Sequence, residues 1–136
     1  MKTFTFRYDP KATPHALFAR VAKAAKARTA DVHKDETSSN SIHAILSAMT
    51  EVRLQVFYAI ADHHPVSMYQ LAQHLKRDQA NVLRDVKALE AMKLVKLVSE
   101  MDGDRERLRP TANYDRIVFD FGAARTGRAK RTVGSN

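Results

Sequence analysis

The sequence contains no cysteine among its 136 residues. This absence excludes disulfide bonds, thiolate zinc sites and cysteine nucleophiles. Long hydrophobic runs are missing too, because no segment approaches about 18 uncharged apolar residues. We therefore expect neither a membrane span nor a signal peptide, and we expect a cytoplasmic protein with no membrane partner.

Glycine is scarce, since the chain has four, three of which lie beyond Asp120. No glycine-rich phosphate loop and no serine in a nucleophile-elbow motif is present. His63, His64 and His74 are close in sequence but lack acids or cysteines at ligand spacing, so we expect solvated or capping groups there. The sequence thus predicts no enzyme, no catalytic residue, no metal and no cofactor.

The net charge of +8 is distributed unevenly. Residues 1–40 carry eight basic residues against four acids, residues 41–121 carry eleven of each, and residues 122–136 carry four against none. A basic excess favours a polyanionic partner. The neutral middle segment remains compatible with DNA binding, because clustering of cations on one face matters more than their sum.

The pattern predicts three segments. Residues 1–40 form an N-terminal extension, with a strand over Thr3–Tyr8, an Ala-rich helix over Thr13–Arg28 and a polar linker that can hold one short strand. Residues 41–121 form the main domain. Residues 122–136 are basic, punctuated by glycine and poor in large apolar side chains, and this composition predicts a disordered tail.

The Ala-rich helix carries a line of three cations, Arg20, Lys23 and Lys26. These cations are suited to DNA phosphates or to a membrane surface. Alternatively, the apolar face of the helix packs on another helix and the cations are solvated.

Four short helices are predicted in the main domain. The first spans residues 41–49, and the second starts at Thr50 and ends at His64-Pro65. Ser67 with Gln70 forms a capping box that opens the third, and Asp78 caps the fourth. The turn between the last two helices is about three residues long. The residues expected to face inward in the first three helices are Ile42, Ile45, Leu46, Leu54, Phe57, Ile60, Ala61, Tyr69, Leu71, Ala72 and Leu75.

Residues 79–93 have two different faces on a helical wheel. The core face carries Val82, Val86 and Leu89. The opposite face carries Ala80, Asn81, Arg84, Lys87, Ala88 and Ala91. Small residues interleaved with two cations and an amide suit close approach to a duplex, since Arg can bond guanine, Asn adenine, and Lys guanine or a phosphate. The alternative is a solvated face on which Arg84 and Lys87 pair with Asp85 or Glu90.

A charged hairpin follows this helix. Leu94–Val98 and Arg105–Arg109 alternate as strands around a turn at residues 101–104. Arg105, Arg107 and Arg109 share one face, from which they can reach phosphates or the minor groove. Alternatively, the arginines belong to a charged edge strand that prevents aggregation.

The order of two short helices, a tight turn and a charged hairpin over residues 66–109 is that of a winged helix-turn-helix. The predicted fold class is therefore mainly α with a small β-hairpin (α+β), a winged helix-turn-helix with an N-terminal strand-helix extension.

Three stretches of the main domain carry a recognisable pattern: Thr50–Leu54, Leu71–Leu75 and the run from Arg77-Asp78 through Asn81–Glu90. Together they resemble winged-helix transcriptional regulators distantly related to the MarR and ArsR groups. The similarity covers roughly residues 41–121, including Tyr114–Ile117. The resemblance implies a dimeric DNA-binding repressor, and some such regulators resemble antitoxins encoded beside a small toxin. The sequence departs from the pattern at Met92-Lys93, where a glycine commonly ends the recognition helix.

The two ends of the chain carry more apolar side chains than a small winged core can bury. Phe4, Phe6 and Tyr8 alternate near the N-terminus, and Ile117, Phe119 and Phe121 alternate near residue 120. We therefore expect these ends to form a homodimer interface, with the strands paired.

The predicted function is a sequence-specific double-stranded DNA-binding regulator, a repressor that excludes polymerase and acts as a homodimer. The helix from Gln79 enters the major groove. The predicted DNA-binding residues are Ser67, Lys76, Arg77, Gln79, Asn81, Arg84, Lys87, Arg105 and Arg107. The alternative is a protein-interaction module, such as an antitoxin that neutralises a toxin protein.

Overall fold

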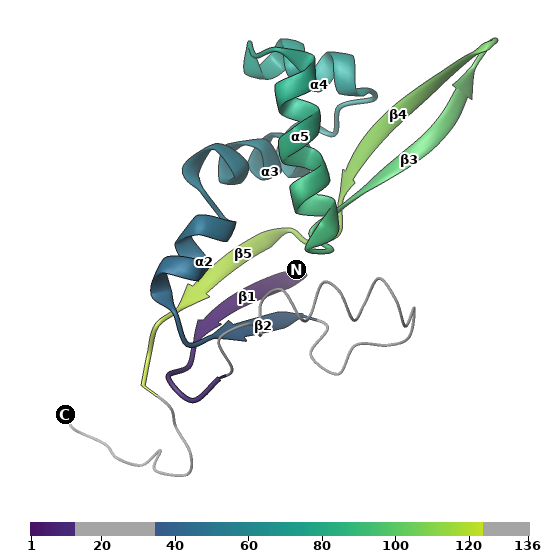
Figure 1. Ribbon diagram of the computed structural model, residues 1–136. Coiled ribbons are helices and arrows are strands. Elements are labelled where there is room, and N and C mark those ends of the chain that lie inside the picture. The colour runs from purple at the N-terminus through teal and green to yellow at the C-terminus, as the bar shows by residue number, and fades with distance from the viewer. Residues whose placement is uncertain (13–34, 124–136) are drawn as a thin grey trace.

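The computed structural model describes residues 1–12 and 35–123, and all structural statements below refer to them. Within this part the chain order of the elements is β1 (Thr3–Tyr8), β2 (Glu36–Ser39), α2 (Ile42–Ala48), α3 (Glu51–His63), α4 (Met68–Leu75), α5 (Gln79–Ala91), β3 (Val95–Asp102), β4 (Arg105–Ala112) and β5 (Arg116–Asp120) (Figure 1).

The expected fold class, a mainly α winged helix-turn-helix with a small hairpin, is wrong. The described residues form an α+β fold with four helices and five strands in two sheets, roughly 41% helical and 31% strand. The strands at the two ends of the chain account for the difference. They build a three-stranded sheet in the order β2-β1-β5, in addition to the two-stranded β3–β4 sheet.

The three-stranded sheet is entirely parallel. β1 lies in its centre, and its Phe6 is in register with Thr37 of β2 and with Phe119 of β5. The linker strand expected between residues 29 and 40 is confirmed as β2. Because parallel neighbours need long crossover connections, β1 pairs with a strand more than 100 residues away, with all of the described helices between them in the sequence. The helices gather on one side of this sheet (Figure 1).

Aromatic rings at the two chain ends meet inside one chain. Phe4 and Phe6 are almost completely buried, with their ring centroids 5.1 Å apart. Phe6 stacks on Phe119 at 5.4 Å, and Phe4 meets Tyr114 edge-on at 5.2 Å. The core of one chain therefore buries Phe4 and Phe6 and partly buries Tyr8, Ile117 and Phe119, whereas Phe121 is 42% exposed. Part of the apolar set expected at a dimer interface is thus used within one chain, and the interface itself stays a prediction.

Each described helix starts with a side chain that accepts a hydrogen bond from the backbone three residues on. The four N-caps are Ser41, Thr50, Ser67 and Asp78. Each cap thus provides an acceptor for one of the backbone N–H groups that have no partner within the first helical turn. The helix starts predicted from these residues are confirmed. The capping box is modified, because the Gln70 side chain accepts from the backbone of Val66 instead of Ser67.

Three residues expected to face inward are exposed. Ile42 and Leu46 of α2 are 44% and 54% exposed, and Tyr69 of α4 is 62% exposed. The α2 helix is only seven residues long and contacts β1 and β2 on one side, so it buries Ile45 alone. In α4, Met68 takes the buried position that Tyr69 was expected to occupy. The other predicted inward residues are buried or partly buried against the core.

Other predictions fall on residues 13–34 and 124–136, which lie outside the described residues. They concern the Thr13–Arg28 helix with Arg20, Lys23 and Lys26, and most of the basic tail.

In the described part, no single helix has the length and apolar composition needed to cross a membrane. Helices α2 and α3 meet these two criteria only when taken together, as a pair bent by 50°. β1 and β2, from the segment predicted as an extension, share a sheet with β5 of the main domain.

Candidate nucleic-acid interface

The turn between α4 and α5 consists of Lys76, Arg77 and Asp78. Lys76 adopts a left-handed conformation with φ of 57°, which ends α4 sharply. The backbone N–H of Arg77 then donates to the carbonyl of Ala72, 3.1 Å away. The predicted three-residue turn is confirmed, and it sets α5 directly beside α4.

One side of α5 is anchored in the core. Val82, Val86 and Leu89 have no measurable solvent exposure, as the helical wheel predicted. On the other side Ala80, Asn81, Arg84, Lys87 and Ala91 are exposed, with Ala88 partly buried at the margin. The described part of the chain leaves this side of α5 uncovered, and we call it the α5 face.

Two polar side chains on the α5 face contact each other. A guanidinium nitrogen of Arg84 donates to the side-chain oxygen of Asn81, 2.9 Å away. In the described residues neither Arg84 nor Lys87 makes an ion pair, so the alternative in which they are paired with Asp85 or Glu90 is not what the structure has. The face thus presents two unpaired cations and an amide between alanines.

Asp85 instead binds two arginines from neighbouring elements. Its carboxylate lies 3.0 Å from a terminal nitrogen of Arg77 and 3.9 Å from Nε of Arg53 on α3. Arg53 also donates to the carbonyl of Ala48, 2.8 Å away. This group, which we call the Asp85 cluster, links α3, the turn and α5. It orients Arg77 towards the protein, so a direct phosphate contact from Arg77 remains a prediction.

A shallow open hollow of about 400 Å³ lies beside the turn. Its lining residues are Tyr69, Ala72, Gln73, Lys76, Arg77 and Gln79. The exposed side chains of Lys76 and Gln79 therefore border a depression at the start of α5. Ser67 is occupied as the N-cap of α4, where its hydroxyl accepts from the backbone of Gln70 at 3.0 Å.

The β3–β4 hairpin carries its arginines in ion pairs. Register places Glu100 opposite Arg107 and Asp102 opposite Arg105. Arg107 lies 3.6 Å from Glu100 and 3.4 Å from Asp102, and Arg109 lies 2.9 Å from Glu100. The hydrogen bond from Arg109 is the main cause that lowers the pKa of Glu100, with the charges of both arginines adding to it.

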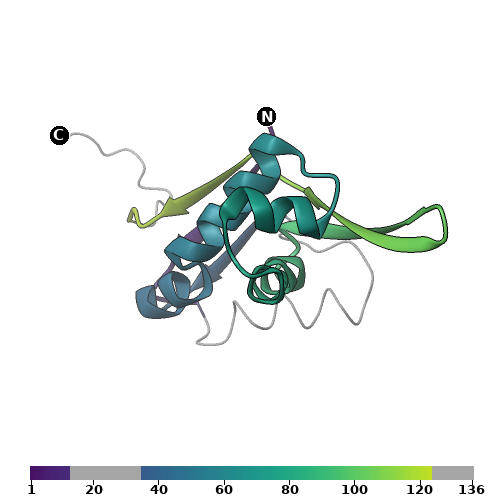
Figure 2. The same ribbon diagram turned by 90° about the horizontal axis from the view of Figure 1, so that it is seen from above.

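Because of these ion pairs, the hairpin offers less positive charge to DNA than its arginines alone suggest. Strands β3 and β4 together carry four basic and three acidic residues, and the turn adds Asp104, so the sum is zero. Arg105 at the tip is exposed and makes no ion pair within the described residues. The hairpin projects away from the helices on the side opposite β5 (Figure 1, Figure 2).

Two further places hold polar groups. The ring centroids of His63 and His74 lie 3.8 Å apart, but the described residues contain no group of three side chains that could hold a metal ion.

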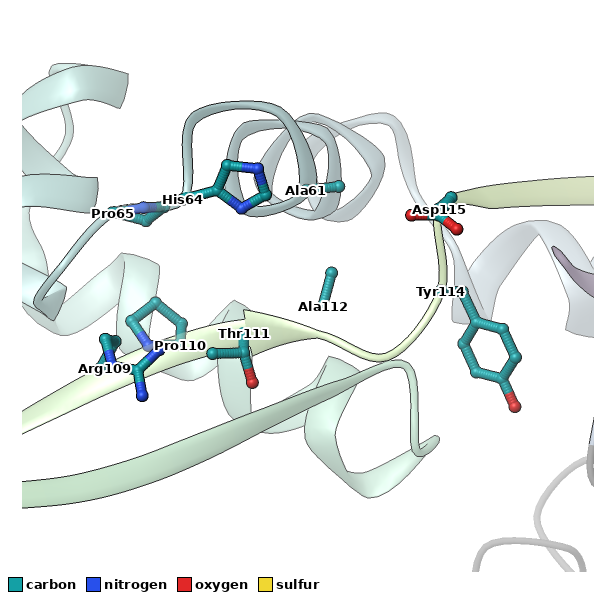
Figure 3. Close-up of a pocket in the computed structure, with 9 residues that line it drawn as sticks. All are labelled: Ala61, His64, Pro65, Arg109, Pro110, Thr111, Ala112, Tyr114 and Asp115. Carbon is teal, nitrogen blue, oxygen red and sulfur yellow. The ribbon is translucent and has the colours of Figure 1, made fainter. Parts of the chain in front are cut away.

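A second hollow, of about 140 Å³, lies between the end of α3 and β4 (Figure 3). Ala112 points towards α3 there, whereas Thr111 and Tyr114 point away from it (Figure 3). This volume is below that of ordinary small-molecule sites, which start at about 300 Å³.

The structure thus brings together five of the predicted contact residues on the turn and the α5 face: Lys76, Gln79, Asn81, Arg84 and Lys87. It separates Arg105 and Arg107, which lie on the hairpin. Sequence reasoning missed Arg53, because its contact with Asp85 joins two helices whose partner residues are 32 positions apart in the sequence.

Comparison with known proteins gives one family. The family described as HVO_A0114 matches residues 48–119, which run from the end of α2 to β5 and include the whole α5 face. No curated protein matches the chain. The family's description does not name the MarR or ArsR groups, so the resemblance to them stays a prediction. Because the match covers more than half of the sequence, the chain belongs to the HVO_A0114 family.

Proposed function

We propose that the protein binds double-stranded DNA in a sequence-specific manner through the α5 face and acts as a transcriptional regulator. The observation that carries this proposal is the pair of cations on that face, Arg84 and Lys87, which no acid neutralises among the described residues. The alanines between them leave room for a groove wall, because their side chains are short. The basic excess of the whole chain adds long-range attraction to a polyanion.

The side chains on the α5 face match the hydrogen-bonding edges of bases. The guanidinium of Arg84 can donate to both acceptors of guanine, and Asn81 can pair with adenine. The hydrogen bond between them restricts both side chains before DNA arrives, which lowers the entropy lost on binding. Lys87 lies one turn further along, where an ammonium group suits a phosphate or a guanine.

The remaining predicted residues take supporting roles in this proposal. Lys76 and Gln79 border the hollow at the start of α5 and contact the DNA backbone. Arg77 acts through the Asp85 cluster, which holds α5 against α3. Ser67 acts as a helix cap, and Arg105 is the hairpin cation best able to reach a phosphate, since Arg107 is held by Glu100 and Asp102.

The test is the salt dependence of binding to random duplexes and to fragments of the native genome, measured by fluorescence anisotropy. The proposal predicts that affinity for random DNA falls steeply between about 50 and 200 mM salt, whereas a selected genomic fragment is retained. Failure to bind either DNA at low salt would contradict it. That outcome would favour the alternative function, a protein-binding module of the antitoxin type.

A further inference from the structure

The outer edge of β5 has no partner strand in the described part of the chain. β5 pairs with β1 on one side only, because the sheet order is β2-β1-β5. The backbone N–H of Arg116 donates to the carbonyl of Lys2, so Arg116 directs its backbone groups towards β1. Neighbouring residues in a strand alternate in this respect. Ile117 and Phe119 therefore direct their N–H and C=O groups outward, away from β1.

Natural edge strands are usually protected against pairing with other chains. The common devices are a lysine or proline in the middle of the strand, a bulge, or a covering segment. The centre of β5 is Ile117-Val118-Phe119, which has none of these residues and has high strand propensity. Its ends are charged with opposite signs, Arg116 at the start and Asp120 at the end.

We propose that this edge pairs with β5 of a second copy of the chain, antiparallel, with Val118 on the two-fold axis. The sequence Arg-Ile-Val-Phe-Asp is self-complementary in this register. Arg116 lies opposite Asp120 of the second copy, Ile117 lies opposite its Phe119, and Val118 lies opposite Val118. The two three-stranded sheets then form one continuous six-stranded sheet.

The hydrogen-bonding pattern fits this register. In an antiparallel pair, facing residues whose backbone groups point at each other exchange two hydrogen bonds. Here those residues are Ile117 and Phe119, which point outward, so the two symmetric pairs make four hydrogen bonds. Val118 then forms the non-hydrogen-bonded pair at the axis, where the two Cα atoms lie about 4.5 Å apart.

The side chains fit as well. Ile117 and Phe119 lie on the inner face of the sheet with Phe4 and Phe6, and both are only partly buried. A two-fold axis perpendicular to the sheet keeps the inner faces of both copies on the same side, so the cross-strand Ile117–Phe119 pairs extend the core. Arg116 lies on the outer face, where Nε donates to Thr3, and Asp120 lies on the same face, paired with Arg7 of its own chain. The register therefore places an arginine opposite a carboxylate and brings no like charges together.

The experiment uses the full chain and exploits its lack of cysteine. Val118→Cys introduces a single thiol at the proposed axis, and Met101→Cys introduces one at the exposed hairpin, 67% accessible and far from β5. We expect sedimentation equilibrium of the unmodified protein to give twice the monomer mass of 15.3 kDa. We expect Val118→Cys to form a disulfide-linked dimer about ten-fold or more faster than Met101→Cys under mild oxidation.

A second pair of variants tests the same axis without oxidation. Val118→Lys puts two ammonium groups side by side and should give a monomer with an unchanged circular dichroism spectrum, whereas Val118→Thr should remain a dimer. An unmodified protein that sediments as a monomer would overturn the proposal. So would a dimer in which Val118→Cys cross-links no faster than Met101→Cys. No DNA is present in these measurements, so their outcome is independent of the proposed function.

Discussion

Arg84 donates a hydrogen bond to the side-chain oxygen of Asn81, one helical turn earlier on the exposed side of α5. Both residues are solvent-exposed, and both sit on a helix whose opposite side is fully buried. The contact couples an amide that suits adenine to a guanidinium that suits guanine. The two side chains are therefore expected to bind DNA as a unit.

This coupling predicts non-additive effects on DNA affinity. We expect the sum of the binding free energies lost in Asn81→Ala and in Arg84→Ala to differ from the binding free energy lost in the double variant by about 0.5–3 kcal/mol. The measurement is a double-mutant cycle of Kd on one selected duplex. In the described residues no hydrogen bond joins Lys87 to Asn81, so the cycle of Asn81→Ala with Lys87→Ala is the control and should be nearly additive. Additivity in both cycles would show that Arg84 and Asn81 bind independently.

The Asp85 cluster predicts a loss of folding stability when its charge is removed. Asp85→Asn leaves Arg53 and Arg77 without their shared anion. Both arginines are 31% exposed, so water screens part of the effect, and we expect unfolding free energy to fall by about 1–2 kcal/mol. Urea denaturation of the unmodified protein and of Asp85→Asn measures this difference in the free energy of unfolding. Glu90→Gln, on the same helix but outside the cluster, should change stability much less, and equal effects would argue against a role of the cluster.

The central position of β1 predicts that the N-terminal strand is essential to the fold. Phe6 is fully buried between Phe4 and Phe119, so Phe6→Ala should reduce the free energy of unfolding by about 3–5 kcal/mol. Thr5→Ala, on the other face of the same strand, is the matched control and should cost far less. A small effect of Phe6→Ala in thermal or urea unfolding would mean that β1 is dispensable, as an extension would be.

The backbone conformation of Lys93 predicts that a substitution at this position stabilises the fold. Lys93 follows α5 with φ of 67°, in the left-handed region that strains any residue with a Cβ atom. We expect Lys93→Gly to raise the free energy of unfolding by about 0.5–1 kcal/mol. Lys93→Ala removes the same charge and keeps the Cβ, so it should give no such gain. A stability order with Ala above Gly would contradict this explanation.

Local features of the fold were predictable from the sequence. The caps Thr50, Ser67 and Asp78 and the core residues Val82 and Val86 act within one or two helical turns, so short-range patterns predicted them correctly. Lys93 adopts the left-handed conformation at the position where the sequence departs from the glycine common in the regulators it resembles.

Long-range relationships were not predictable in the same way. The alternation of Phe4 and Phe6 predicted a strand, and the strands at the two ends were expected to pair across a dimer. A single sequence does not show that β1 and β5 pair in parallel within one chain, so the three-stranded sheet and the fold class were missed. The ion pairs of Arg107 with Glu100 and Asp102 depend on cross-strand register. The three arginines therefore looked like a free cationic row, whereas two of them are neutralised.

The most direct test of the central claim is sequencing of native genomic fragments selected by the protein and by Arg84→Ala. We predict that the unmodified protein enriches a discrete site, that Arg84→Ala loses about 1–3 kcal/mol in affinity together with its sequence preference, and that Lys96→Ala on the hairpin retains both. Selection of the same fragments with the same footprint by Arg84→Ala would contradict the assignment of the α5 face as the DNA-reading surface.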